Sequence, residues 1–164
     1  MAIDNTIGGA SADSYGTLAE YQAYAAALGW NLPGPDSADE QNLKRAAQII
    51  DREYNFKGYA QYQTQARQFP RVHVGLVKGW PVDPDTVPND IKHAQYELAY
   101  LLHGGLDPTA TVTGVVKVER SKAGPVESET EYQGGKGEPR LVAIRGLLQP
   151  YLSHSGGQVK LARA

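Results

Sequence analysis

One stretch of this sequence, residues 54–82, combines the two kinds of side chain that hold single-stranded nucleic acid. It contains no aspartate or glutamate, and aromatic and basic residues alternate along it: Tyr54, Phe56, Lys57, Tyr59, Tyr62, Arg67, Phe69, Arg71, Lys78 and Trp80. Aromatic rings stack on bases while cations neutralise phosphates, a chemistry that tolerates any base sequence. We call this stretch the connector; it is too long for an idle loop between two helices.

Two interpretations of the connector follow from its composition. If it binds nucleic acid, the expected contacts are Lys57, Tyr59, Tyr62, Arg67, Phe69 and Arg71. Alternatively, its aromatic residues cap a core, and its cations face solvent or the carboxylates of a partner. Four cations over nearly thirty residues are sparse, and the whole chain has a net charge of −2, so composition favours the structural interpretation.

Catalytic and metal-binding chemistry is not indicated elsewhere. The chain has no cysteine, and His93 and His103 would lie about 280° apart around one helix, so they do not converge on a metal. Asp83, Asp85 and Asp90 lack the glycine and the terminal glutamate of a calcium loop. No nucleophile motif or phosphate-binding loop is present. We therefore expect no enzymatic activity, no metal and no cofactor.

The hydrophobic periodicity predicts a mainly α protein with a small β part: a bundle of three to four helices, a β-hairpin and a flexible C-terminal arm. Capping boxes at Thr17 with Glu20 and at Ser37 with Glu40 predict the starts of two helices. Pro88 opens a third helix, and a short final helix follows after residue 140. We expect a helical domain over residues 1–137, which includes the hairpin at about 112–132, and a C-terminal helix and arm over 138–164.

The last part of the chain differs in charge from the rest. Residues 139–164 contain four basic residues and no acid, giving +4, whereas residues 1–138 carry −6. The hairpin alternates apolar and charged residues, and a lone hairpin is marginal in water. We therefore expect it to make subunit contacts through Val116, Val118, Val126 and Tyr132. The start of the chain lacks the pattern of a secretory signal, which favours a protein made in the cytoplasm.

Several runs of residues resemble a known family in their order and spacing. They are residues 14–24 (SYGTLAEYQAY), 43–51 (LKRAAQIID), 65–71 (QARQFPR), the helix opened by Val87 and Pro88, the hairpin 117–127, and 147–152 (LLQPYL). Together they resemble head–tail connector (adaptor) proteins of tailed phages and prophages, a family often labelled DnaT-like ssDNA-binding. Phe69 stands where that family usually has tryptophan.

This resemblance implies a structural virion protein located at the head–tail neck and assembled in the host cytoplasm. It implies a ring of about twelve copies beneath the portal protein that docks the tail, a stopper or a tail terminator. Genomic double-stranded DNA would pass through the ring without specific binding. The expected portal contacts lie on the C-terminal helix and arm: Arg140, Arg145, Leu147, Leu148, Tyr151, Leu152, Lys160, Leu161 and Arg163.

Two other functions stay open from the sequence. One is a single-stranded DNA-binding replication accessory protein that uses the connector. The other is a tail-completion or terminator component, which would also form a ring but bind tail tubes.

Overall fold

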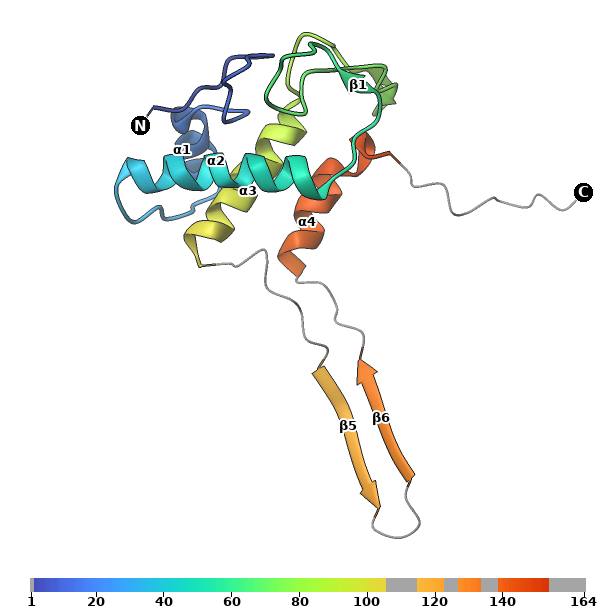
Figure 1. Cartoon of the computed structure of the whole chain (residues 1–164). Helices are drawn as coiled ribbons and strands as arrows, with labels where there is room; N and C mark the ends of the chain where they lie inside the picture. The colour runs from blue at the N-terminus through green and yellow to red at the C-terminus, as the bar shows by residue number, and fades with distance from the viewer. Residues whose placement is uncertain (1, 106–114, 123–126, 134–138, 154–164) are drawn as a thin grey trace, which may run out of the picture.

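A computed structural model describes residues 2–105, 115–122, 127–133 and 139–153 of the chain. Its helices are α1 (Leu18–Ala27), α2 (Asp36–Glu53), α3 (Asn89–His103) and α4 (Pro139–Leu148), followed by the 3-10 turn η1 (Gln149–Tyr151). Four short strands lie in the connector: β1 (Tyr59–Ala60), β2 (Arg71–Val72), β3 (Leu76–Val77) and β4 (Trp80–Pro81). Further along, β5 (Val115–Lys122) pairs with β6 (Glu127–Gln133) (Figure 1). The predicted fold class, mainly α with a small β part, is confirmed.

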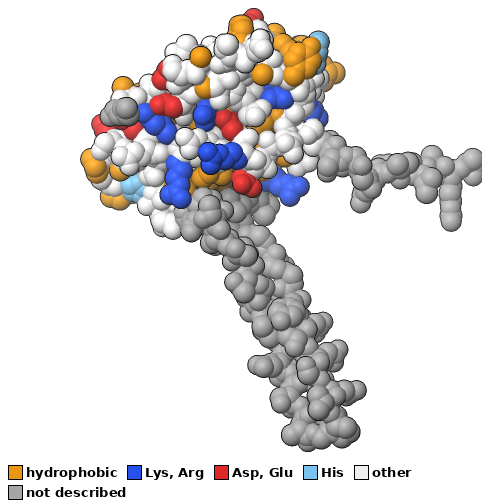
Figure 2. Space-filling model, in the orientation of Figure 1, with side chains coloured by type: hydrophobic (Ala, Val, Ile, Leu, Met, Phe, Trp, Pro, Cys, Tyr) orange, Lys and Arg blue, Asp and Glu red, His pale blue; other side chains and the backbone are white. Residues whose placement is uncertain are grey.

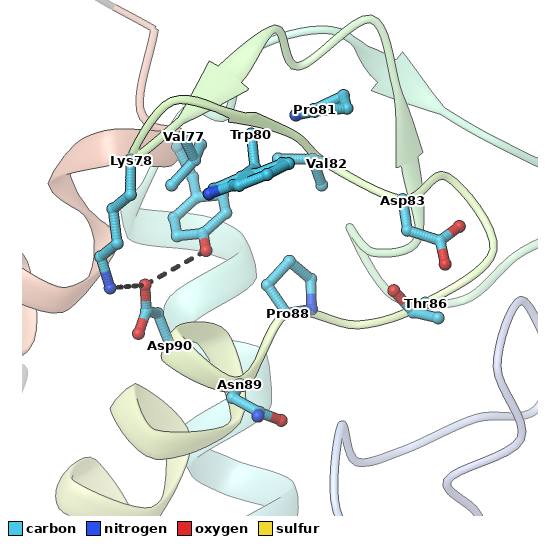
Figure 3. A pocket seen from close by; sticks show the side chains of 11 residues that line it. Val77, Lys78, Trp80, Pro81, Val82, Asp83, Thr86, Pro88, Asn89 and Asp90 are labelled. Carbon is cyan, nitrogen blue, oxygen red and sulfur yellow. Dashed lines mark hydrogen bonds and ion pairs between the residues drawn. The ribbon is translucent and has the colours of Figure 1, made fainter.

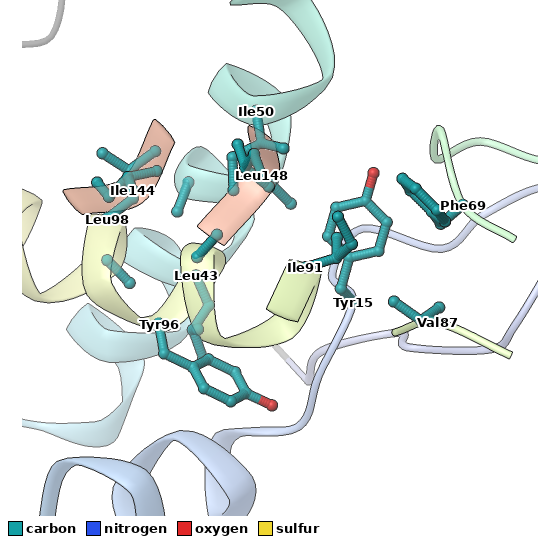
Figure 4. Packing of buried hydrophobic residues seen from close by; sticks show 14 of the residues in the cluster. Tyr15, Leu43, Ile50, Phe69, Val87, Ile91, Tyr96, Leu98, Ile144 and Leu148 are labelled. Atoms are coloured by element: carbon teal, nitrogen blue, oxygen red, sulfur yellow. The ribbon is translucent and has the colours of Figure 1, made fainter. Parts of the chain in front are cut away.

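Helix α3 is central because it packs against α1, α2 and α4. Its buried residues surround its axis, the pattern of a helix enclosed by its neighbours. Figure 4 shows the core that results, with Leu43 and Ile50 of α2, Ile91 and Leu98 of α3, and Ile144 and Leu148 of α4. Helix α4 therefore completes the core of the preceding helices. The domain boundary predicted near residue 137 falls outside the described residues and stays a prediction.

The two predicted capping boxes have different outcomes. At α1, the Thr17 hydroxyl accepts from the Glu20 amide at 3.1 Å, and the Glu20 carboxylate accepts from the Thr17 amide at 2.8 Å. The box predicted at Ser37 is wrong, because α2 begins two residues earlier than that box requires, with Pro35 as its N-cap and no side-chain cap. Asp36 and Asp39 in the first turn favour the positive end of the helix dipole instead.

A buried glutamine ties the segment before α1 to the other helices. The Gln95 carbonyl oxygen accepts from the Tyr15 and Gly16 amides at 3.1 and 3.3 Å. Its amide nitrogen donates to the Ser14 hydroxyl at 2.7 Å and to the Leu43 carbonyl at 2.9 Å. Because all four bonds are made, Gln95 can be fully buried without the cost of an unsatisfied polar group.

The predicted hairpin is present as β5 (Val115–Lys122) and β6 (Glu127–Gln133), an antiparallel pair. Val116 pairs with Tyr132, but Val118 pairs with Glu131, because the register shifts between Val116 and Val118. Val126 lies outside the described residues. Subunit contacts by the hairpin stay a prediction.

Candidate nucleic-acid interface

Arg71, predicted to contact nucleic acid, is instead a buried support of the connector. Its guanidinium donates to the carbonyls of Lys57 at 2.8 Å, Gly58 at 2.7 Å, Gln68 at 3.2 Å and Phe56 at 3.4 Å. A fifth bond reaches the Gln68 side chain at 2.6 Å. Burial lowers the pKa of the Arg71 guanidinium, while hydrogen bonds to carbonyl oxygens of two chain segments stabilise its positive charge. Arg71 is therefore not available to a phosphate.

Two further predicted contacts also serve the interior. Phe69 is 2% exposed and packs edge to face on Phe56 and Tyr151, with ring centroids at 5.0 and 6.0 Å. Arg67 lies 3.2 Å from Asp51 of α2, a carboxylate that also accepts a hydrogen bond from Tyr15. Burial raises the pKa of Asp51, although Tyr15 and Arg67 act against this shift. Phe69 and Arg67 thus fix the connector to the helical core, and we no longer expect them to contact DNA.

The connector lysines have partners too. The Lys57 ammonium donates to the Pro150 carbonyl at 2.9 Å, which joins the connector to η1. Lys78 lies 2.9 Å from Asp90 at the start of α3. The acid-free connector therefore obtains carboxylate partners from outside itself, from α2 through Asp51 and from α3 through Asp90.

Three aromatic side chains of the connector remain exposed: Tyr59 at 58%, Tyr62 at 45% and Trp80 at 77%. Tyr59 lies on β1 (Tyr59–Ala60), which pairs with β2 (Arg71–Val72), and its ring meets His73 edge to face at 5.0 Å. The Tyr62 ring lies so close to Gly8 that a β-carbon there would approach it to 2.4 Å. Tyr59 and Trp80 thus have the more open rings.

Trp80 owes its position to a tight turn. Strands β3 (Leu76–Val77) and β4 (Trp80–Pro81) are joined by Lys78 and Gly79, whose φ angles are 53° and 87°. Two positive φ angles match the hairpin turn whose twist suits antiparallel strands, and Pro81 cannot donate to a further strand. The pair therefore stays at an edge, where Leu76 is also exposed at 67%. Figure 2 shows hydrophobic side chains gathered at the connector end of the molecule.

Trp80 stands over a shallow pocket of about 320 Å³ between the β3–β4 turn and the start of α3 (Figure 3). We call it the Trp80 pocket; its volume is at the lower end of the range typical of small-molecule sites. Trp80 lies opposite Pro88 across it, and Asp83 and Asn89 supply polar groups. One oxygen of Asp90 accepts from both Lys78 at 2.9 Å and the Tyr151 hydroxyl at 3.2 Å. The pocket thus pairs an open aromatic face with a few polar side chains.

From the sequence, Trp80 is one of the aromatic residues of the connector but is not a predicted contact. Two neighbours of the exposed rings, His73 beside Tyr59 and the exposed Leu76, are not predicted either. The signal that could have found Trp80 is the following proline. A tryptophan directly before Pro81 sits at the end of strand pairing, where a large ring is less readily enclosed.

The residues predicted to bind a portal protein lie in several different environments. Leu148 and Tyr151 are buried in the core, and Leu147 is half-buried. Leu152 forms a backbone bridge with Phe56, and Arg145 is exposed. The side chain of Arg140, and all of Lys160, Leu161 and Arg163, lie outside the described residues.

Within the part of the chain that the structure describes, no three His, Asp or Glu side chains converge to hold a metal ion. No helix in that part has both the length and the apolar character needed to cross a membrane.

Fold and surface together define a small, mainly helical protein with an exposed aromatic face. Its described residues contain no cluster of side chains that could hold a metal ion. Comparison with protein families identifies it further. The family model described as "Putative DnaT-like ssDNA binding protein" matches residues 1–164, and the chain belongs to this family. Comparison with curated proteins and with solved structures found no match.

This match corrects the function predicted from the sequence. It names single-stranded DNA binding over the whole chain, and nothing in the comparisons supports a head–tail connector or a virion protein. The resemblance to head–tail connectors depended on the order and spacing of short runs of common residues, and no single run is specific to one family. The alternative prediction, single-stranded DNA binding, is the one that the match supports.

Proposed function

We propose that this protein binds single-stranded DNA, and that Trp80 is the principal stacking residue. The observation that carries this proposal is the 77% exposure of the Trp80 ring above the Trp80 pocket. Leaving an indole in water forgoes the stability that its burial would give, so such a residue on a structured turn favours a ligand-binding role. The family match supports the choice of ligand.

Binding by stacking fits the rest of the connector. Tyr59 offers a second open ring, and every base has a face that can stack, so the proposed binding is tolerant of sequence. No acidic residue lies in the connector, which leaves Asp83 and Asp90 as the carboxylates beside Trp80. The Asp90 charge is already balanced by Lys78. We further propose that the protein acts by binding alone, without catalysis.

The first test uses the fluorescence of the two tryptophans. Trp30 is half-buried and stacks on Tyr100 with ring centroids at 4.2 Å, so the W30F variant leaves Trp80 as the only indole. Titration of W30F with an oligo-dT strand should quench this fluorescence as a base stacks on Trp80. The W80A variant should bind labelled oligo-dT about 5- to 150-fold more weakly, since stacking contributes about 1–3 kcal/mol per base.

W30F serves as the matched control, because it changes the other tryptophan and should bind like the wild type. Circular dichroism should show that both variants are folded. Trp80 lies outside the core, and W30F replaces one half-buried aromatic ring by another. Binding by W80A at wild-type affinity, with the fold intact, would remove Trp80 from the interface. No binding of the wild type to any oligonucleotide would refute the proposed function itself.

A further inference from the structure

The positively charged side chains that the structure describes fall into two groups. The first group consists of cations that already have a partner within the protein: Lys44, Lys57, Arg67, Arg71, Lys78 and Lys92. Lys44 lies 2.7 Å from Asp13, and Lys92 lies 2.9 Å from Glu20. A phosphate that approached Lys44, Lys78 or Lys92 would have to displace a carboxylate, and one that approached Lys57 would have to displace the Pro150 carbonyl.

The second group consists of three exposed arginines, Arg45, Arg52 and Arg145. None of them forms a hydrogen bond or an ion pair with another residue in the described ranges, and we call them the free arginines. Arginine binds phosphate well because its planar guanidinium donates two parallel hydrogen bonds. The free arginines are thus the described cations that a DNA backbone can reach without breaking an internal contact.

Their positions form a row across two helices. Arg45 and Arg52 are seven residues apart on α2, which places them on one stripe of the helix about 10 Å apart. Arg145 on α4 lies near Tyr54 at the end of α2: burial raises the pKa of Tyr54, and the Arg145 charge opposes that shift. Figure 2 shows several Lys and Arg side chains on the face of the molecule that α2 presents, with Asp and Glu side chains among them.

The acids near this row leave it positively charged. Asp51 is already engaged by Arg67 and Tyr15, so its charge is balanced inside the protein. Glu53 is exposed beside Arg52 in the sequence. Among the described residues next to these arginines in the sequence, Glu53 is the one acid not engaged in this way, so the three arginines and their neighbours carry a net positive charge in a protein whose total charge is negative.

We propose that Arg45, Arg52 and Arg145 bind phosphates of the single strand whose bases stack on the connector. This inference rests on the proposed function and adds to it a second surface, which holds the DNA backbone. Each phosphate neutralised on a single strand contributes about −0.7 to the slope of log K against log salt. Three free arginines therefore predict a slope of about −2 for the wild type.

The test compares two double variants of equal charge change. R45Q/R52Q removes two free arginines, and its slope should fall in magnitude to about 0.7. K44Q/K92Q removes two cations that have internal partners, and its slope should stay near that of the wild type. Affinity for labelled oligo-dT is measured from 50 to 300 mM NaCl by fluorescence anisotropy, with thermal unfolding to verify that each variant is folded.

Single variants keep the test decisive if a double variant folds poorly. R45Q, R52Q and R145Q should each reduce the magnitude of the slope by about 0.7. Equal loss of slope in both double variants would mean that net charge alone matters, and would overturn the proposal. An unchanged slope in R45Q/R52Q, with the wild type still binding, would overturn it and leave the proposed function standing. A wild type that binds no oligonucleotide overturns both.

Discussion

Replacing Arg71 by lysine should destabilise the protein, although the positive charge is kept. The Arg71 guanidinium makes five hydrogen bonds, to four carbonyls and one side-chain amide. A lysine has one ammonium group and cannot reach acceptors on both sides, so at least two bonds are lost. Hydrogen bonds to charged groups contribute about 1.5–3 kcal/mol each, so the free energy of unfolding should fall by about 3 kcal/mol or more.

Such a loss is large against the total stability of about 5–15 kcal/mol typical of a domain. The assay is urea denaturation of R71K followed by circular dichroism. R52K is the matched control: Arg52 is exposed without a hydrogen bond to described residues, so its replacement should change stability by less than about 0.5 kcal/mol. If R71K unfolds with the wild-type midpoint but binds oligo-dT more weakly, Arg71 acts on the ligand and its structural assignment is wrong.

Two further perturbations test the fold around the first helix. A β-carbon at Gly16 would lie 1.9 Å from the Tyr96 hydroxyl oxygen, so G16A should cost about 1–3 kcal/mol of unfolding free energy, and Y96F should restore part of it in a double-mutant cycle. Hydrogen bonds from Thr6 and Ser11 lower the pKa of Asp4 to about 2, so the carboxylate stabilises the folded state above its ordinary pKa and loses this effect as the pH falls toward 2. D4N should therefore melt below the wild type at pH 6, with the gap closing by pH 2; a gap that is constant with pH would contradict the assignment.

The helices could be predicted from sequence because their signals are local. Thr17 and Glu20 carry their capping box within four residues, and the apolar stripe of α2 repeats within one helix. The capping box at Ser37 failed because the helix begins at Asp36, where Asp36 and Asp39 favour the positive end of the helix dipole, and spacing alone does not decide between N-caps two residues apart.

The connector could not be predicted in the same way, because it has no periodicity that assigns its aromatic residues to a side. Phe56 and Phe69 are buried while Tyr59 and Trp80 are exposed, although all four had been considered as a cap on the core. The difference depends on contacts far along the chain, such as the packing of Phe69 on Tyr151.

The chain has ten tyrosines and two phenylalanines, and tyrosine is enriched at interfaces between proteins. In this structure several tyrosines have a role inside the protein instead. Several tyrosine hydroxyls donate to carboxylates of other helices: Tyr15 to Asp51, Tyr24 to Glu97, Tyr96 to Glu20 and Tyr151 to Asp90. Burial, with the nearby carboxylate, raises the pKa of Tyr151 to about 12, so its hydroxyl stays protonated and remains a donor at physiological pH. Tyrosine content is therefore weak evidence for contacts between subunits in this chain.

If the proposed function is correct, net charge is a poor guide to it, because net charge counts all cations and does not separate those that are already neutralised inside the protein. The connector has no acidic residue of its own, but Asp51 of α2 pairs with Arg67 and Asp90 of α3 pairs with Lys78. Conversely, the acidic total concealed arginines on α2 and α4 that have no ion pair within the described ranges. In the proposed complex the binding energy would come mostly from stacking, with a small electrostatic part, since about three phosphates give a slope of only about −2. A strand held this way would stay bound at salt concentrations that release proteins dependent on many phosphate contacts.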